Sequence, residues 1–180
     1  MITVFNEDEA VDILLNQKIL AFYQEGQAEI GPRALGNRSI LFDPRNKHGK
    51  KIVNEIKKRE NYRPFAGSVL IEHANEWFEM GNIKESPHML FSIPVKKNKK
   101  NKIPSIVHVD GSCRVQTVSK KQNKEFYNLI ECFYQQTNVP ILLNTSFNIA
   151  GEPLVDTMNH ALETIKNSKI KYLYVSRKQL

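Results

Sequence analysis

The sequence has few cysteines, no long apolar stretch and no grouping of metal-binding side chains. Its 180 residues include only Cys113 and Cys132, which we expect to be free thiols because nothing else indicates an oxidising compartment. No segment is both long and apolar enough to cross a bilayer, so we expect no contact with a membrane. The N-terminal residues are acidic and lack a basic segment followed by an apolar run, so we expect no signal peptide and a cytoplasmic location.

Two further absences concern phosphate-binding loops and metal sites. The glycines match neither the Walker pattern nor the dinucleotide-binding fingerprint, which removes the two commonest phosphate-binding loops. The five histidines do not have metal-ligand spacing, so we expect no structural or catalytic metal bound by the chain. They are His48, His73, His88, His108 and His160.

Acidic residues are fewer than basic ones, which favours anionic partners. The 26 Lys and Arg against 19 Asp and Glu give 26 − 19 = +7, and this charge is compatible with nucleotides, phosphates or nucleic acid. The densest run, Lys96–Lys102, contains no aromatic residue. Because proteins that bind single-stranded nucleic acid usually combine stacking rings with charge, we interpret this run as a solvated hairpin loop.

Apolar periodicity predicts alternating helices and strands. Helical spacing occurs at residues 7–17, 46–58, 73–79, 123–136 and 157–167. Strand patterns occur at residues 18–23, 39–42, 68–71, 89–95, 105–109, 114–118, 139–143 and 171–175. This order favours an α/β (α+β) fold, with a mixed β-sheet and helices packed on it. The length and the lack of a linker predict one domain over residues 1–180.

Four segments carry chemistry-bearing side chains. In residues 29–39, two glycines and a proline hold Arg33 and Arg38 in a loop, where backbone amides and guanidinium groups could bind phosphate. A surface turn with incidental arginines is the alternative. In residues 57–65, four cations precede a strand, and Lys57 and Arg63 could converge on a phosphate, with Glu60 orienting one of them. A solvated basic face is the alternative there.

The other two segments lie next to strands. Residues 108–116 form a tight turn that places Ser112 and Arg114 beside a strand start. In residues 142–148, Asn144, Ser146 and Asn148 follow an apolar strand. Because ligands usually bind at the carboxyl ends of strands in open α/β sheets, these polar groups are well placed to contact one.

In this order the segments EIGPRALGNRSIL, IKKRENYRPFA, HVDGSCRVQTV and PILLNTSFNIAGEP resemble the C-terminal domain of the NodU/CmcH/TobZ-type O-carbamoyltransferases. The resemblance extends from about Leu15 to Val175 and implies a YrdC-like fold with an open twisted mixed sheet. It implies that the domain binds carbamoyl phosphate and ATP, with Mg²⁺ arriving on the nucleotide, and forms carbamoyl adenylate. It also implies that fixed cations supply most of the catalysis, without a side-chain nucleophile.

The resemblance implies a role for individual residues. Lys57 and Arg63 would clamp the phosphate of carbamoyl phosphate, and Arg114 and Asn144 would hold the carbamoyl or α-phosphate portion of the adenylate. Six further residues are expected to bind the substrate or ATP. They are Arg33, Arg38, Arg59, Ser112, Ser146 and Asn148.

In the family, an N-terminal domain carries the metal-binding histidines and the acceptor site, and we expect that this domain is not part of the present chain. The resemblance therefore implies an adenylating half that works with a separate N-terminal-type carbamoyltransferase chain or is encoded as a truncated piece of a longer gene. Two alternatives stay open: a catalytically inactive nucleotide-binding or regulatory subunit, and an RNA-binding YrdC-like protein. The four preserved motifs argue against the RNA-binding alternative.

Overall fold

A computed structural model describes residues 1–176 of the chain. These residues form eight strands, five α-helices and two short 3-10 helices. The strands are β1 (Ile2–Val4), β2 (Leu20–Gln24), β3 (Arg38–Phe42), β4 (Ala66–Leu70), β5 (Ser92–Pro94), β6 (Ser112–Val118), β7 (Ile141–Ser146) and β8 (Tyr172–Ser176). The helices are α1 (Glu7–Leu15), α2 (Gly49–Ile56), α3 (Ala74–Trp77), α4 (Lys124–Thr137) and α5 (Met158–Lys166), with 3-10 turns η1 (Ile71–His73) and η2 (Lys100–Lys102).

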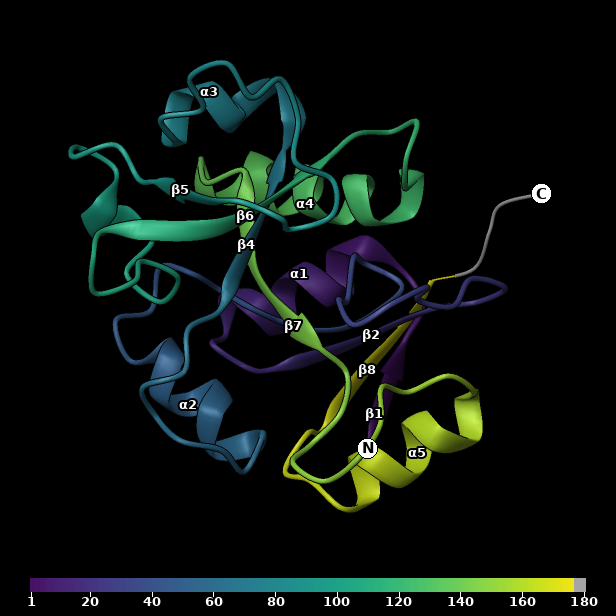
Figure 1. Cartoon of the computed structure of the whole chain (residues 1–180). Helices are drawn as coiled ribbons and strands as arrows, with labels where there is room; N and C mark the ends of the chain where they lie inside the picture. Colours follow the sequence, from purple (N-terminus) through teal and green to yellow (C-terminus); the bar gives the residue numbers. More distant parts are fainter. Residues whose placement is uncertain (177–180) are drawn as a thin grey trace.

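The eight strands form one mixed sheet in the order β1-β8-β2-β3-β7-β4-β6-β5 (Figure 1). The pairs β1-β8, β2-β8 and β4-β6 are parallel, and the pairs β2-β3, β3-β7, β4-β7 and β5-β6 are antiparallel. The predicted α/β fold with a mixed sheet is therefore confirmed. In the centre, β7 runs antiparallel to both β3 and β4, so its carboxyl end lies beside the amino ends of those two strands.

Helix capping explains where three helices begin. The side chains of Asn6, Asn123 and Thr157 accept hydrogen bonds from the main chain of the first turn in α1, α4 and α5. A cap of this kind satisfies an amide that has no partner within the helix. Helix α4 ends at Asn138, which adopts a left-handed conformation with φ 56°. Asparagine tolerates this conformation better than most residues, and the chain can then turn into β7.

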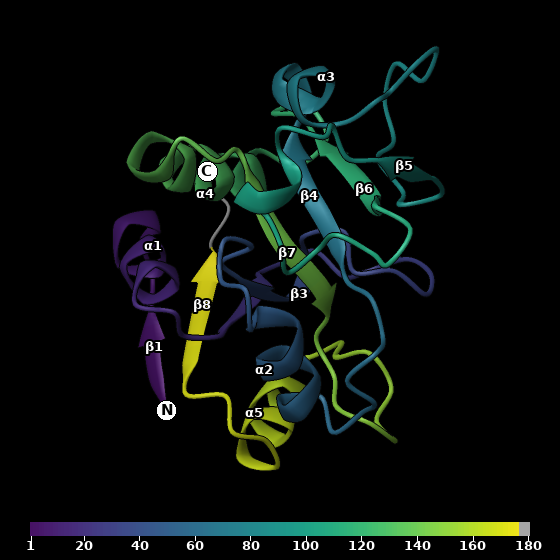
Figure 2. The same ribbon diagram turned by 90° about the vertical axis from the view of Figure 1, so that its left-hand side faces the viewer.

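One cluster of buried apolar side chains extends from Val4 to Val175. Helices α1 and α4 pack against each other (Figure 2), and Phe126 on α4 contacts Phe22 on β2 with ring centroids 5.7 Å apart. Helices α2 and α5 lie at the lower end of the molecule in Figures 1 and 2. Within residues 1–176, no helix combines the length and the apolar character needed to cross a membrane. Cys113 is buried, Cys132 is partly exposed, and both thiols are free.

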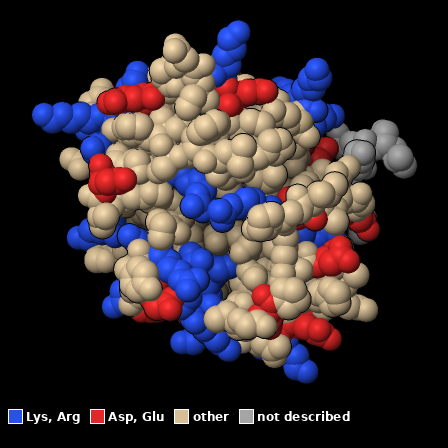
Figure 3. Space-filling view, viewed as in Figure 1, with Lys and Arg blue, Asp and Glu red and all other residues tan. Residues whose placement is uncertain are grey.

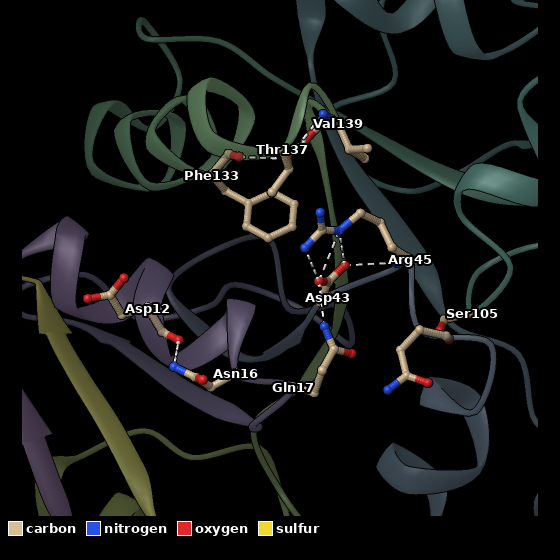
Figure 4. Close-up of polar contacts among 10 residues, drawn as sticks. Asp12, Asn16, Gln17, Asp43, Arg45, Ser105, Phe133, Thr137 and Val139 are labelled. Atoms are coloured by element: carbon tan, nitrogen blue, oxygen red, sulfur yellow. Dashed lines mark hydrogen bonds and ion pairs between the residues drawn. The ribbon is translucent and has the colours of Figure 1, made fainter.

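An ion pair with a buried carboxylate and a partly exposed arginine lies where β3 ends (Figure 4). The carboxylate of Asp43 is fully buried, and it accepts hydrogen bonds from Arg45 Nη2 at 2.6 Å and from Gln17 Nε2 at 2.8 Å. The Arg45 guanidinium also lies 5.4 Å from the ring centroid of Phe133 on α4. These contacts connect the end of α1, the end of β3 and α4, so the buried charge has both a partner and a structural role.

The structure differs from the sequence predictions at four places. Strand β1 was not predicted, and it pairs in parallel with β8 at the edge of the sheet. The predicted strand at residues 105–109 is wrong, because this segment forms turns in which Ile106 is buried. The predicted strand at residues 89–95 shortens to β5. The basic run Lys96–Lys102 contains η2 rather than a plain hairpin loop, and Lys99 pairs with Glu76 and lies over the ring of Trp77.

Candidate anion-binding site

The central strands bring three of the predicted site residues onto one face of the sheet. Ala66 at the start of β4 pairs with Arg114 on β6 and with Asn144 on β7. Residues paired in register project to the same face, and two strand spacings place these two backbones about 10 Å apart. Ser146 lies two residues after Asn144 and shares that face. The loop of residues 29–37 reaches the same place, because Asn144 Nδ2 donates to the carbonyl of Ala34 at 3.1 Å.

A hollow of about 110 Å³ lies where β4 begins and β7 ends. Figure 3 shows Lys and Arg side chains on both sides of a hollow in the middle of this face. The lining includes five of the ten predicted catalytic or binding residues: Arg33, Arg59, Arg114, Asn144 and Ser146. The lining residues are Pro32, Arg33, Ala34, Arg59, Pro64, Phe65, Ala66, Met89, Arg114, Asn144, Thr145 and Ser146.

Three guanidinium groups face the hollow without a carboxylate among its lining residues. Burial, followed by the charge of Arg63, lowers the pKa of Arg59 to about 10. Burial, followed by the charge of Arg33, lowers the pKa of Arg114 from its ordinary value. With this pKa, Arg59 remains cationic at neutral pH. Partly buried positive charge without a carboxylate partner is expected of an anion site. A bound anion would offset both the free-energy cost of burying the charge and the repulsion between the arginines.

Asn54 on α2 positions Arg59. Arg59 Nε donates to Asn54 Oδ1 at 2.6 Å, and Asn54 Nδ2 donates to the carbonyls of Asn61 and Arg63 at 3.2 Å and 3.1 Å. The guanidinium carbon of Arg59 lies 4.6 Å from the ring centroid of Phe65. Arg59 Nη2 is buried and has no hydrogen-bond partner within residues 1–176. A fixed guanidinium with an unpartnered nitrogen is well suited to bind an anionic oxygen.

The carboxylate of Glu29 shapes the loop that carries Arg33. Glu29 Oε1 accepts hydrogen bonds from the amides of Leu35 and Asn37, both at 2.8 Å, and of Arg38 at 3.0 Å. The sequence suggested that amides of this loop could bind phosphate, but these three amides are occupied by Glu29. Gly36 allows the loop to approach α4, because a Cβ at this position, with φ 97°, would lie 2.1 Å from the ring of Phe126. The loop therefore presents the Arg33 side chain to the hollow.

Lys57 supports the site from behind its lining. It is 4% exposed, and its Nζ donates to the carbonyl and hydroxyl oxygens of Ser146 at 2.6 Å and 3.1 Å. It also donates to the carbonyl and Oδ1 of Asn148, both at 2.9 Å. Burial, followed by the positive charge of Arg59, lowers the pKa of Lys57 to about 7. Lys57 thus holds the turn after β7, and it reaches the hollow through Ser146.

Four other predicted ligands lie outside the lining. Arg38 is 3% exposed and donates to the carbonyls of Gln24 at 2.7 Å and Asp156 at 3.0 Å. The Arg63 side chain is about half exposed and pairs with Glu60 at 2.8 Å.

Ser112 hydrogen bonds to Ser92 and Asp110, both at 2.7 Å. Asn148 uses both ends of its side-chain amide, since Oδ1 accepts from Lys57 and Nδ2 donates to the carbonyl of Glu152 at 2.8 Å. The geometry gives Arg38, Ser112 and Asn148 structural contacts, and their role as direct ligands stays a prediction, as it does for Arg63.

The sequence analysis missed several residues that build the site. Glu29 and Asn54 orient the arginines, and Met89 lines the hollow with an unusual positive φ of 55°. Ser68 and Gln116 are buried polar residues beneath Asn144. Their polar side chains at inward-facing strand positions were the signal that could have identified them. Within residues 1–176, no three His, Cys, Asp or Glu side chains are grouped as metal ligands.

Comparison with protein families assigns residues 11–180 to the family described as "Carbamoyltransferase C-terminus". The chain is 50% identical over 153 residues to nodulation protein NolNO of Sinorhizobium fredii, which covers 84% of the chain and 22% of that protein. It is 38% identical over 152 residues to the 3'-hydroxymethylcephem-O-carbamoyltransferase of Amycolatopsis lactamdurans, covering 84% of the chain and 28% of that enzyme.

Solved structures share the fold at low sequence identity. Full-length HypF, in a phosphate- and nucleotide-bound form, matches 95% of the chain and 24% of its own length, with a TM-score of 0.65 and 17% identity. P. abyssi Sua5 in complex with L-threonine matches 96% of the chain and 49% of its own length, with a TM-score of 0.65 and 16% identity. These neighbours confirm the predicted YrdC-like architecture.

The chain spans about a quarter of the length of the curated relatives it matches. The family match covers nearly all of the chain and includes every residue of the hollow. The chain belongs to the carbamoyltransferase C-terminal family, which includes domains of the NodU and CmcH type.

Proposed function

We propose that this domain binds carbamoyl phosphate and ATP at the arginine-lined hollow and forms carbamoyl adenylate. The observation that carries the proposal is the convergence of Arg33, Arg59 and Arg114 on a hollow whose lining contains no carboxylate. The hollow also contains the amide of Asn144, a neutral group that suits a neutral carbamoyl end. Charge and a placed amide together match a small molecule that carries a phosphate at one end and a carboxamide at the other.

The chemistry needs two steps. Water first takes the phosphoryl group of carbamoyl phosphate, which leaves inorganic phosphate and carbamate. A carbamate oxygen then attacks the α-phosphorus of ATP, and pyrophosphate leaves with the electron pair of the broken P–O bond. Both steps gather negative charge on phosphate oxygens, and fixed guanidinium groups stabilise such charge without a nucleophilic side chain.

The residues around the hollow divide these tasks. Arg59 offers the unused Nη2 donor to a phosphate oxygen, and Arg33 and Arg114 offer further guanidinium groups. Lys57 keeps Ser146 in place. Arg63 pairs with Glu60 and adds positive charge near Arg59. The lining offers no carboxylate to a magnesium ion, so Mg²⁺ would be held by phosphate oxygens, and we assign no step to it.

Exposed apolar side chains lie close in sequence to residues that line the hollow, and they support a larger assembly. Four of them lie within two residues of a lining residue, and Val109 follows His108, whose ring hydrogen bonds to the carbonyl of the lining residue Phe65. Ile30 and Val109 are fully exposed. Such residues commonly mark an interaction surface. Because the curated relatives are about four times longer, we propose that the acceptor-binding part of a longer protein, or a partner chain, covers this rim. The rim consists of Ile30, Tyr62, Leu90, Phe91 and Val109.

The test is pyrophosphate release by the purified chain in the presence of ATP and carbamoyl phosphate. We expect release that needs both substrates and is lost in Arg59→Met and Arg114→Met, with Lys58→Met as an exposed control that keeps the activity. Release that persists in both arginine variants would contradict the assignment. Ligand binding without release, even after an N-terminal carbamoyltransferase part is added, would identify a catalytically inactive nucleotide-binding subunit instead.

A further inference from the structure

Three buried polar side chains form a network beneath the hollow. Ser68 on β4, Gln116 on β6 and Asn144 on β7 lie on one face of three adjacent strands, and they are 0%, 4% and 1% exposed. Ser68 Oγ donates to Gln116 Oε1 at 2.6 Å. Asn144 Nδ2 donates to Ser68 Oγ at 2.9 Å and approaches Gln116 Oε1 at 3.1 Å. Of the three, only Asn144 lines the hollow.

Two main-chain carbonyls fix the direction of both amides. Gln116 Nε2 donates to the carbonyl of Leu35 at 2.8 Å, and Asn144 Nδ2 donates to the carbonyl of Ala34 at 3.1 Å. A carbonyl can only accept, so each amide must turn its NH₂ group toward the loop. The oxygen of Gln116 then faces Ser68, which donates to it and accepts from Asn144. If either amide were reversed, its oxygen would face a main-chain carbonyl oxygen, and neither atom could donate a hydrogen bond. The network therefore has one consistent arrangement.

This arrangement leaves a single unused polar atom. Asn144 Oδ1 is buried and has no hydrogen-bond partner among residues 1–176, although a buried carbonyl oxygen normally has one. The other charged and amide groups in the lining are the guanidinium donors of Arg33, Arg59 and Arg114. The hollow therefore combines a fixed amide oxygen that has no partner with several cationic donors.

We infer that Ser68 and Gln116 are positioning residues that hold the oxygen of Asn144 toward the ligand, so that the site selects an acyl phosphate bearing an N–H group over one bearing a methyl group. This inference rests on the proposed function, since it specifies how the same hollow recognises the carbamoyl group. The NH₂ of carbamoyl phosphate can donate to Asn144 Oδ1. The methyl group of acetyl phosphate has nearly the same size but leaves that oxygen buried without a partner.

The expected selectivity follows from that unmade hydrogen bond. A buried acceptor left without a donor reduces binding about 5- to 150-fold, and sites built to bind an N–H reject analogues that lack it. The same network also ties the loop of Arg33 to the sheet through the carbonyls of Ala34 and Leu35. Loss of the network would therefore weaken the binding of all anions equally. The ratio of the affinities for carbamoyl phosphate and acetyl phosphate separates recognition of the N–H group from this structural effect.

The experiment measures, by titration calorimetry on the purified chain, the affinities for carbamoyl phosphate, acetyl phosphate and inorganic phosphate. The test variants are Ser68→Ala and Gln116→Met, and Ser68→Thr retains the hydroxyl. The matched control is Ser86→Ala, because Ser86 is also a buried serine, 2% exposed, and donates to the carbonyl of Val115 outside the network.

We expect the wild-type chain to bind carbamoyl phosphate at least 10-fold more tightly than acetyl phosphate. This ratio should fall several-fold in Ser68→Ala and Gln116→Met and persist in Ser68→Thr and Ser86→Ala. Equal wild-type affinities, or a ratio unchanged in both test variants, would overturn the inference while leaving the anion site intact. If none of the three phosphates binds to the wild-type chain, the proposed function fails, and the inference fails with it.

Discussion

The buried amine of Lys57 makes a pH-dependent contribution to stability that can be measured. Its pKa is lowered by burial from an ordinary value of 10.5 to about 7, so the folded state releases this proton at a lower pH than the unfolded state does. Between these two values the unfolded chain binds more protons, and the free energy of unfolding rises with pH. The direction is opposite to that of a lysine stabilised by an ion pair.

The magnitude follows from linkage. One proton difference changes the free energy of unfolding by about 1.4 kcal/mol per pH unit, so Lys57 should add about 2 kcal/mol between pH 7 and pH 9. The side chain is 4% exposed, so solvent screening is small. The assay is urea unfolding of the wild type and of Lys57→Met at several pH values, because the difference between the two removes the contribution of other titrating groups.

The control is Lys58→Met, which removes the adjacent charge from an exposed side chain and shows how much of the difference comes from losing a neighbouring lysine. A wild-type advantage over Lys57→Met that stays constant from pH 7 to pH 9 would refute the reasoning. It would mean that the four oxygen acceptors around Nζ keep the ammonium form despite its burial.

Three further predictions concern other parts of the structure. Arg59→Met should weaken the binding of inorganic phosphate about 10-fold or more in calorimetry, because a charged hydrogen bond contributes roughly 1.5–3 kcal/mol; an unchanged affinity would remove Arg59 from the site. Gly36→Ala should destabilise the chain by about 2–4 kcal/mol in urea unfolding, because its Cβ would meet Phe126, whereas Gly31→Ala has open space and should cost about 1 kcal/mol. Asp43→Ala should cost about 2–3 kcal/mol, since it leaves Arg45 and Gln17 without their acceptor, and a change under 0.5 kcal/mol would show that water replaces the carboxylate.

The fold was largely predictable because most helices and strands show a clear periodicity of apolar residues. Helix α4 and strand β7 show the helical and strand patterns over enough residues to be distinguished. Strand β1 has only three residues and is stabilised by pairing with β8, at the other end of the chain. The segment 105–109 has strand-like composition, but Ile106 contributes to the core from a turn. Local patterns do not contain such long-range information.

The candidate site was predictable as a set of segments and less so residue by residue. Lys57 and Arg59 lie in the same basic segment, but only Arg59 lines the hollow. The residue between them, Lys58, has a positive φ of 53°, which turns the chain after α2 and separates the directions of its two neighbours. Composition and spacing do not specify that turn. The resemblance predicted a role for Asn144, which lines the hollow, whereas the network beneath it required the strand register.

The carboxylate of Glu29 has a consequence for the affinity of the site. A glycine-containing loop usually loses conformational freedom when it closes on a ligand, and that loss reduces affinity. Here the loop is already ordered by an internal anion that binds the amides of Leu35, Asn37 and Arg38. Its entropy is lost during folding, before any ligand arrives. Ligand binding therefore meets a loop already in place, and the attraction of Arg33 for an anion contributes to affinity without this entropic cost.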